Sequence, residues 1–124
     1  MQNQAVAAQA YQSQGQKGAA PRELEAMLLM KAAAKLQAVV DSWPDSRGEK
    51  MDHALTYNRK LWTMFVANMA DPECGHPKQL RENISNLGLY SFKQMLSVTR
   101  SERPENLRGL VSINRNLAAG LRGE

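Results

Sequence analysis

Apolar side chains recur at three- and four-residue steps in four successive segments of the chain. This spacing is the period of an amphipathic helix, and no segment shows the two-residue alternation of a half-buried strand. The pattern predicts an all-α fold, a small bundle of four long helices, because short connections favour antiparallel neighbours. The four predicted helices span Pro21–Trp43, Glu49–Ala70, Pro77–Arg100 and Pro104–Ala119.

Proline and glycine mark where the helical domain begins and ends. Prolines stand at three of the predicted helix starts and directly after the first helix, where helical geometry is disfavoured. Residues 21–124 are therefore expected to form a single helical domain. Residues 1–20 are expected to form an N-terminal arm with a flexible joint at residues 15–18. The arm can add a weaker helix near residues 4–13, and a frayed tail is the alternative.

Two asparagines interrupt the apolar stripes of the second and fourth predicted helices. Asn58 falls between Leu55 and Leu61, and Asn114 falls in the same way within its own stripe. A buried amide without a hydrogen-bond partner costs about 1–3 kcal/mol. Either both amides are solvated, or two helices meet around a buried amide contact that fixes their register. On the second hypothesis, leucine at either position should perturb register or partner binding more than solubility.

The third predicted helix contains a segment of low charge, Leu87 to Val98, in which Lys93 is the single charged residue. We expect it to be the central and most covered helix of the bundle. Gly88 costs about 1 kcal/mol relative to alanine in a helix interior. Close approach of another helix would explain it, and a plain helix defect is the alternative. The residues expected to face inward are Leu80, Ile84, Leu87, Gly88, Phe92, Met95, Leu96 and Val98.

The first predicted helix begins with Glu23 and Glu25, which suit the positive end of a helix dipole. It continues through the run from Met27 to Met30, which is apolar nearly all round and needs cover on more than one side. Methionine supplies flexible contacts that serve either an adaptable binding surface or ordinary core filling. The internal methionines are Met27, Met30, Met51, Met64, Met69 and Met95.

Length and charge place the chain among small soluble domains. The 124 residues carry a formal net charge of +4, which permits an acidic or nucleic-acid partner without requiring one. The single cysteine fits a reducing compartment. No apolar run approaches the ~20 residues of a membrane span, and no secretory signal opens the chain. A cytoplasmic location is therefore expected.

The sequence offers little material for catalysis or metal binding. It has neither a glycine-rich phosphate loop nor a nucleophile elbow. Cys74 and His76 could bind a metal, but no second pair stands at zinc-site spacing, so an ordinary loop is favoured. We expect no enzyme activity, no cofactor and no metal. Arg108, Arg115 and Arg122 recur at seven-residue steps and form either a solvated edge or a stripe that contacts phosphates.

Five segments together resemble the FlaF family of flagellar biosynthesis regulators, from about Tyr11 to Arg122. The most specific is the last, and their order and spacing strengthen the match. They are Ala10–Gln12, Pro21–Glu25, Asn58–Trp62, Leu80–Ile84 with the following Leu87–Phe92, and Ile113–Leu121.

The resemblance implies a small, helical, cytoplasmic protein that promotes flagellin synthesis or secretion. It implies flagellin as a partner, bound as an export chaperone would bind it, and the regulator FlbT as a further partner. A small helical protein can hold a partner helix in an apolar groove. The residues expected to contact a partner are Tyr11, Met27, Met30, Asn58, Arg59, Trp62, Asn114 and Arg115.

Direct binding of flagellin mRNA is the alternative function, with the arginines at 108, 115 and 122 on phosphates. Against it, the chain lacks an aromatic stacking platform and any RNA-binding signature. Salt dependence separates the two functions, because binding through phosphates weakens steeply with salt and binding through an apolar groove does not.

Overall fold

The computed structural model describes residues 20–98 and 104–123. These residues form four helices, α2 (Ala20–Asp41), α3 (Glu49–Met69), α4 (Lys78–Val98) and α5 (Glu105–Leu121), and contain no strand. The predicted all-α fold is confirmed, and the described helix ends lie within two residues of the predicted ones. The predicted N-terminal helix, with Tyr11, lies outside the described residues, as does the predicted end of the third helix at Arg100.

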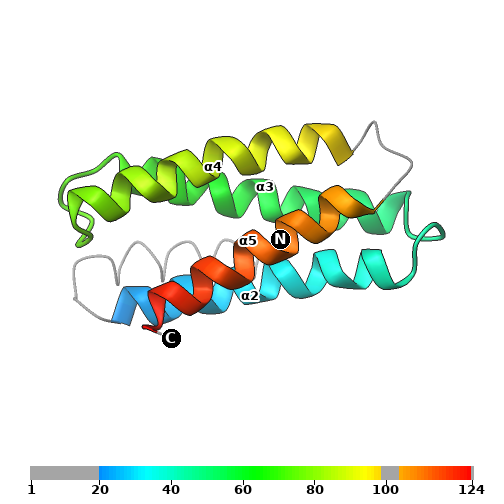
Figure 1. Cartoon of the computed structure of the whole chain (residues 1–124), viewed down its shortest axis with the longest axis horizontal. Coiled ribbons are helices and arrows are strands. Elements are labelled where there is room, and N and C mark those ends of the chain that lie inside the picture. Colours follow the sequence, from blue (N-terminus) through cyan, green and yellow to red (C-terminus); the bar gives the residue numbers. More distant parts are fainter. Residues whose placement is uncertain (1–19, 99–103, 124) are drawn as a thin grey trace.

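The helices form a ring in which each contacts the next along the chain and α5 returns to α2. Each helix runs antiparallel to both of its neighbours, and the end of α5 lies beside the start of α2 (Figure 1). The most extensive contact is the one between α2 and α5, the first and last of the described helices. Two pairs, α2 with α4 and α3 with α5, therefore face each other diagonally across the bundle.

The core consists of two apolar clusters, and all four helices contribute to each. One cluster, around Leu29, Trp62 and Ile84, lies toward the start of α2. The other, around Leu36 and Leu107, lies toward its end. Each fully buried leucine contributes about 1.5–3 kcal/mol relative to an exposed one.

The expectation that the third predicted helix would be the most covered is wrong. Leu96, predicted to face inward, has 63% of its surface exposed, and Leu89 and Tyr90 of α4 are 59% and 51% exposed. The described core residues of α4 are Ile84, Gly88, Ser91, Met95 and Val98, a narrower set than in α3. The low charge of the segment from Leu87 to Val98 therefore marks an apolar outer surface as well as a buried face.

Gly88 marks the closest approach between α3 and α4. A Cβ atom built at this position would lie 2.4 Å from Val66 Cγ2 and 3.4 Å from Trp62 Cε3. Atoms cannot approach that closely, so a larger residue would force the helices apart. The predicted close approach of another helix is confirmed, and it brings Trp62 over the backbone of α4.

None of the described helices is long and apolar enough to cross a bilayer.

Candidate functional site

A network of buried amides joins α3 to α5 across the centre of the bundle. Asn114 Nδ2 donates to Asn58 Oδ1 at 2.7 Å, and Trp62 Nε1 donates to Asn114 Oδ1 at 2.9 Å. All three side chains are fully buried. The predicted contact between the two asparagines is therefore confirmed. We call Asn58, Trp62 and Asn114 the central amide network.

The central amide network fixes how far α3 and α5 can slide past each other. Each hydrogen bond needs its donor and acceptor at one level of the bundle, and a shift of one turn would leave buried polar atoms without partners. A buried, unpaired donor or acceptor costs about 1–3 kcal/mol, whereas a methylene that shifts along an apolar surface loses far less. Polar contacts of this kind give a bundle a single register.

Met95 connects this network to the surface. Asn58 Nδ2 donates to Met95 Sδ at 3.4 Å, and Met95 also lines an open groove of about 500 Å³ between α3 and α4. We call this hollow the α3–α4 groove. Its described lining is Asp52, Leu55, Thr56, Arg59, Phe92, Met95 and Leu96. The buried amides thus hold one residue of the groove in position.

The α3–α4 groove is largely apolar and has one charge of each sign on its α3 side. Leu96 lies in it with 63% of its surface exposed, and Leu89, two turns earlier in α4, is 59% exposed. Together with half-buried Phe92 they are spaced at positions i, i+3 and i+7. This is the spacing at which one helix contacts another. Asp52 and Arg59 are exposed and supply the charges.

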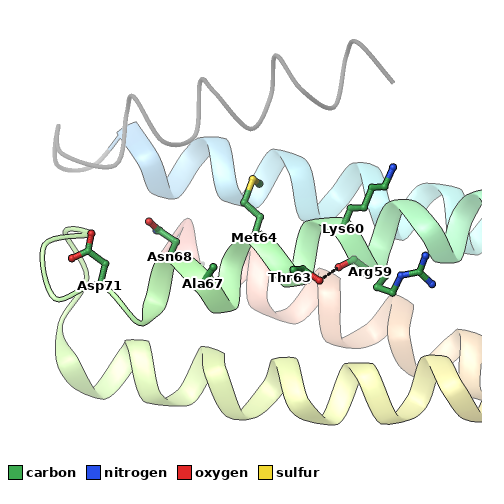
Figure 2. Close-up of a pocket in the computed structure, with 7 residues that line it drawn as sticks. All are labelled: Arg59, Lys60, Thr63, Met64, Ala67, Asn68 and Asp71. Carbon is green, nitrogen blue, oxygen red and sulfur yellow. Dashed lines mark hydrogen bonds between the residues drawn. The ribbon is translucent and has the colours of Figure 1, made fainter.

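A second hollow, of about 460 Å³, lies on the outer side of α3. Its described lining is Arg59, Lys60, Thr63, Met64, Ala67, Asn68 and Asp71. Figure 2 shows Lys60 and Met64 extending toward the side on which α2 runs, whereas Arg59 starts from the other edge of α3 and extends along the helix. Arg59 lines both this hollow and the α3–α4 groove. The dashed line in Figure 2 is the 2.7 Å hydrogen bond from Thr63 Oγ1 to the carbonyl oxygen of Arg59.

A second buried polar contact ties the loop between α3 and α4 to the first turns of α2. His76 Nε2 donates to Glu25 Oε1 at 2.8 Å, and both residues are buried, as is nearby Cys74. Sequence reasoning assigned Glu25 only to the helix dipole, since a partner 51 residues away leaves no local pattern. In the described part of the chain, no three residues among His, Cys, Asp and Glu are grouped to hold a metal ion.

The basic residues of α5 have different surroundings from one another. Arg122 Nε and Nη2 each lie 3.1 Å from Glu23 Oε1, which ties the end of α5 to the start of α2. Arg108 and Arg115 are exposed. The predicted stripe of three arginines thus includes one that already pairs with a carboxylate.

A family model described as flagellar protein FlaF matches residues 7–121. The chain belongs to the FlaF family. No curated protein and no solved structure matches this FlaF chain. The family name connects the protein with the flagellum, and the described fold is all-helical, as the resemblance implied.

The structure divides the residues predicted to contact a partner into three groups. Asn58, Trp62 and Asn114 are brought together in the interior. The exposed ones are Met27 (53%), Met30 (37%), Arg59 and Arg115, and they lie on three different helices. Tyr11 lies outside the described residues. Partner binding by any of these FlaF residues stays a prediction. Sequence reasoning missed the exposed Leu89 and Leu96.

Proposed function

We propose that this FlaF protein is a flagellin-binding regulator of flagellum biogenesis, and not an enzyme. It acts in the cytoplasm, where it promotes flagellin synthesis or secretion by holding a helical segment of flagellin in the α3–α4 groove. FlbT is the further partner that the resemblance implies. Membership in the FlaF family supports the flagellar role.

The exposure of Leu96 beside an apolar hollow carries this proposal. A leucine with 63% of its surface in water, next to the half-buried Phe92, gains free energy when a partner covers it. Full burial of a leucine contributes about 1.5–3 kcal/mol relative to full exposure. Phe92 and Leu96 of α4 line the groove, so an amphipathic helix can bind there with its apolar side toward these two residues.

The charges beside the groove suit a protein helix better than a nucleic acid. Asp52 and Arg59 have opposite signs, so a bound helix can present one charge to each. A phosphate backbone would gain from Arg59 and be repelled by Asp52. Arg122 is also paired with Glu23, which reduces the basic surface available on α5.

Calorimetric titration of flagellin into the purified protein tests the proposal. We expect Leu96→Glu to weaken binding at least about tenfold, because it places a charge in an apolar contact. The wild-type affinity should persist at high salt, and binding should show a negative heat-capacity change. Circular dichroism of the variant should be unchanged, since Leu96 is exposed in the free protein.

Two sets of control variants test the two alternatives, a flagellin site on α2 and direct RNA binding. Met27→Glu and Met30→Glu place the same charge on exposed methionines of α2. If they remove binding while Leu96→Glu does not, the surface of α2 is the flagellin site, as the sequence pattern first indicated. If Arg108→Ala and Arg115→Ala together remove binding, and leader RNA binds with a steep salt dependence, RNA binding replaces this proposal.

A further inference from the structure

A cluster of basic side chains lies on the surface between α2 and α3. Lys31 Nζ and Lys35 Nζ lie over the ring of Tyr57, 5.9 Å and 5.1 Å from its centroid. Lys35 Nζ also lies 3.4 Å from His53 Nε2. We call these four residues the α2–α3 basic face. Two helices thus bring three basic groups together over one aromatic ring, of which only 5% is exposed.

The α2–α3 basic face holds like charges together without a carboxylate between them. Lys31 and Lys35 stand at positions i and i+4 of α2, where two like charges destabilise a helix. The ring of Tyr57 attracts both ammonium groups and so restricts where they can lie. Among the described residues, neither lysine forms an ion pair with a carboxylate. An anionic group bound between these lysines would therefore relieve their repulsion without having to order free side chains.

Apolar side chains continue the α2–α3 basic face toward the start of α2. Met27, one turn before Lys31, is 53% exposed. On α3, Met64 is half-buried, lines the hollow of about 460 Å³ and extends toward the side on which α2 runs (Figure 2). Methionine supplies adaptable apolar contacts to a protein partner. The surface therefore offers positive charge at one end and apolar contact at the other.

This combination fits a protein helix better than a single-stranded nucleic acid. Bases of a single strand bind by stacking on exposed aromatic rings. The ring of Tyr57 is buried and lies beneath two ammonium groups, so it offers no such platform. Carboxylates at positions i and i+4 of a partner helix share one side of that helix and match the spacing of Lys31 and Lys35.

We propose that the α2–α3 basic face is the docking site of an acidic amphipathic helix of a partner protein. The carboxylates of that helix lie against Lys31 and Lys35, and its apolar residues lie against Met27. The net charge of +4 favours approach of an acidic partner. Because the α3–α4 groove is lined by a different set of residues, this docking does not depend on the proposed binding of flagellin in that groove.

Fluorescence anisotropy with a labelled synthetic peptide tests the proposal. The probe is an amphipathic helix longer than ~15 residues, with glutamates at i and i+4 beside a row of leucines. The matched peptide has glutamine in place of each glutamate. We expect the glutamate peptide to bind at least about tenfold more tightly than the glutamine peptide, and to lose affinity as salt increases. Equal affinities, or no binding of either peptide, would overturn the proposal.

Variants of the protein locate the bound peptide. Lys31→Gln/Lys35→Gln should weaken binding of the glutamate peptide at least about tenfold, with an unchanged circular dichroism spectrum. Lys78→Gln/Lys93→Gln removes the same charge from exposed positions of α4 and should leave the affinity unchanged. Leu96→Ala, in the α3–α4 groove, should also leave it unchanged. Equal losses in the two lysine pairs would show attraction by net charge alone, and a loss in Leu96→Ala would place the peptide in the groove. Either result would make this assignment wrong.

A single-stranded RNA oligonucleotide tests the competing occupant. We expect it to displace the glutamate peptide only at low salt, where attraction between any opposite charges is strong. If the RNA binds more tightly than the peptide, and Lys31→Gln/Lys35→Gln removes its binding, the α2–α3 basic face is a nucleic-acid site and the proposed protein helix is excluded.

Discussion

Two buried contacts between polar side chains of the described residues differ in chemistry, one at the centre of the bundle and one at its end. The central amide network is neutral and joins α3 to α5 across the diagonal. The contact between Glu25 and His76 joins α2 to a loop and consists of a carboxylate and an imidazole. His76 Nδ1 is buried with no hydrogen-bond partner among the described residues, whereas no polar atom of the central network is left without one.

This difference indicates that the two buried polar contacts have different structural roles. A fully paired neutral network can sit between apolar clusters, where it selects one register for two helices over a wide range of pH. The hydrogen bond between Glu25 and His76 joins a helix to a loop, so its loss can release the loop while the core stays packed. We expect the first contact to control global stability and the second to control local attachment of the loop.

The largest expected effect is that of Asn114→Leu. The substitution leaves Asn58 Oδ1 and Trp62 Nε1 buried without these partners, at about 1–3 kcal/mol each, so the free energy of unfolding should fall by about 2–6 kcal/mol. Urea unfolding followed by circular dichroism measures this loss. The double variant Asn58→Leu/Asn114→Leu should lose less than the sum of the two single variants. Simple additivity would show that the two amides act independently.

Gly88→Ala should have the next largest effect, because the added methyl group overlaps Val66 and presses on Trp62, the indole donor of the central network. We expect a loss of about 1–3 kcal/mol in the free energy of unfolding. Gly109→Ala is the matched control, since nothing lies within 4 Å of its Cβ position. That variant should gain about 0.5–1 kcal/mol in the same urea titration. If Gly88→Ala raised the free energy of unfolding as much as Gly109→Ala does, the close approach of α3 and α4 at Gly88 would be contradicted.

His76→Ala should have a smaller and more local effect. Loss of the hydrogen bond leaves Glu25 buried with one partner fewer, at a cost of about 1–3 kcal/mol that is partly relieved if the loop opens. The rate at which a thiol reagent modifies Cys74, which is buried in this loop, reports that opening. The rate should increase more in His76→Ala than in Gly88→Ala. The reverse order would show that Cys74 becomes accessible only through global unfolding.

The smallest expected effect concerns pH and Tyr57, the neighbour of Asn58 in sequence. Burial raises the pKa of Tyr57 above its ordinary value of 10.0. The unfolded chain then loses the phenol proton first, so the stability contributed by this group is present below pH 10 and is lost as pH rises through the folded pKa. Tyr57→Phe should flatten this part of the stability profile. Tyr90→Phe, at a half-exposed tyrosine, is the control, and an equal change in both variants would contradict the assignment.

Much of the fold and one part of the candidate site could be predicted from the sequence because their signals are local. The helical period gave the four helices, and each asparagine stands out against its own apolar stripe. Since a buried amide needs a partner, two such residues in one small bundle predict each other. Gly88 could be interpreted in the same way, because glycine destabilises a helix interior and a close contact with another helix explains its presence.

The features that sequence reasoning missed depend on positions in space. Glu25 and His76 are 51 residues apart, and an acidic residue in a first helical turn already has a sufficient local explanation. Leu96 stands next to buried Met95, and helical spacing assigns both to a broad inner side. Only the packing of α3 against α4 shows that the leucine lies at the open edge of a groove.

The extensive contact between α2 and α5 also has a consequence for the folding of the chain. Because these helices are the first and last of the described bundle, a ribosome must release α5 before the bundle can close. Until then, the buried side of α2 has only α3 to cover it. Helical bundles made from local contacts fold fast, and closure by contacts distant in sequence delays the final step. We therefore expect nascent chains that lack α5 to be the form most exposed to proteases and aggregation.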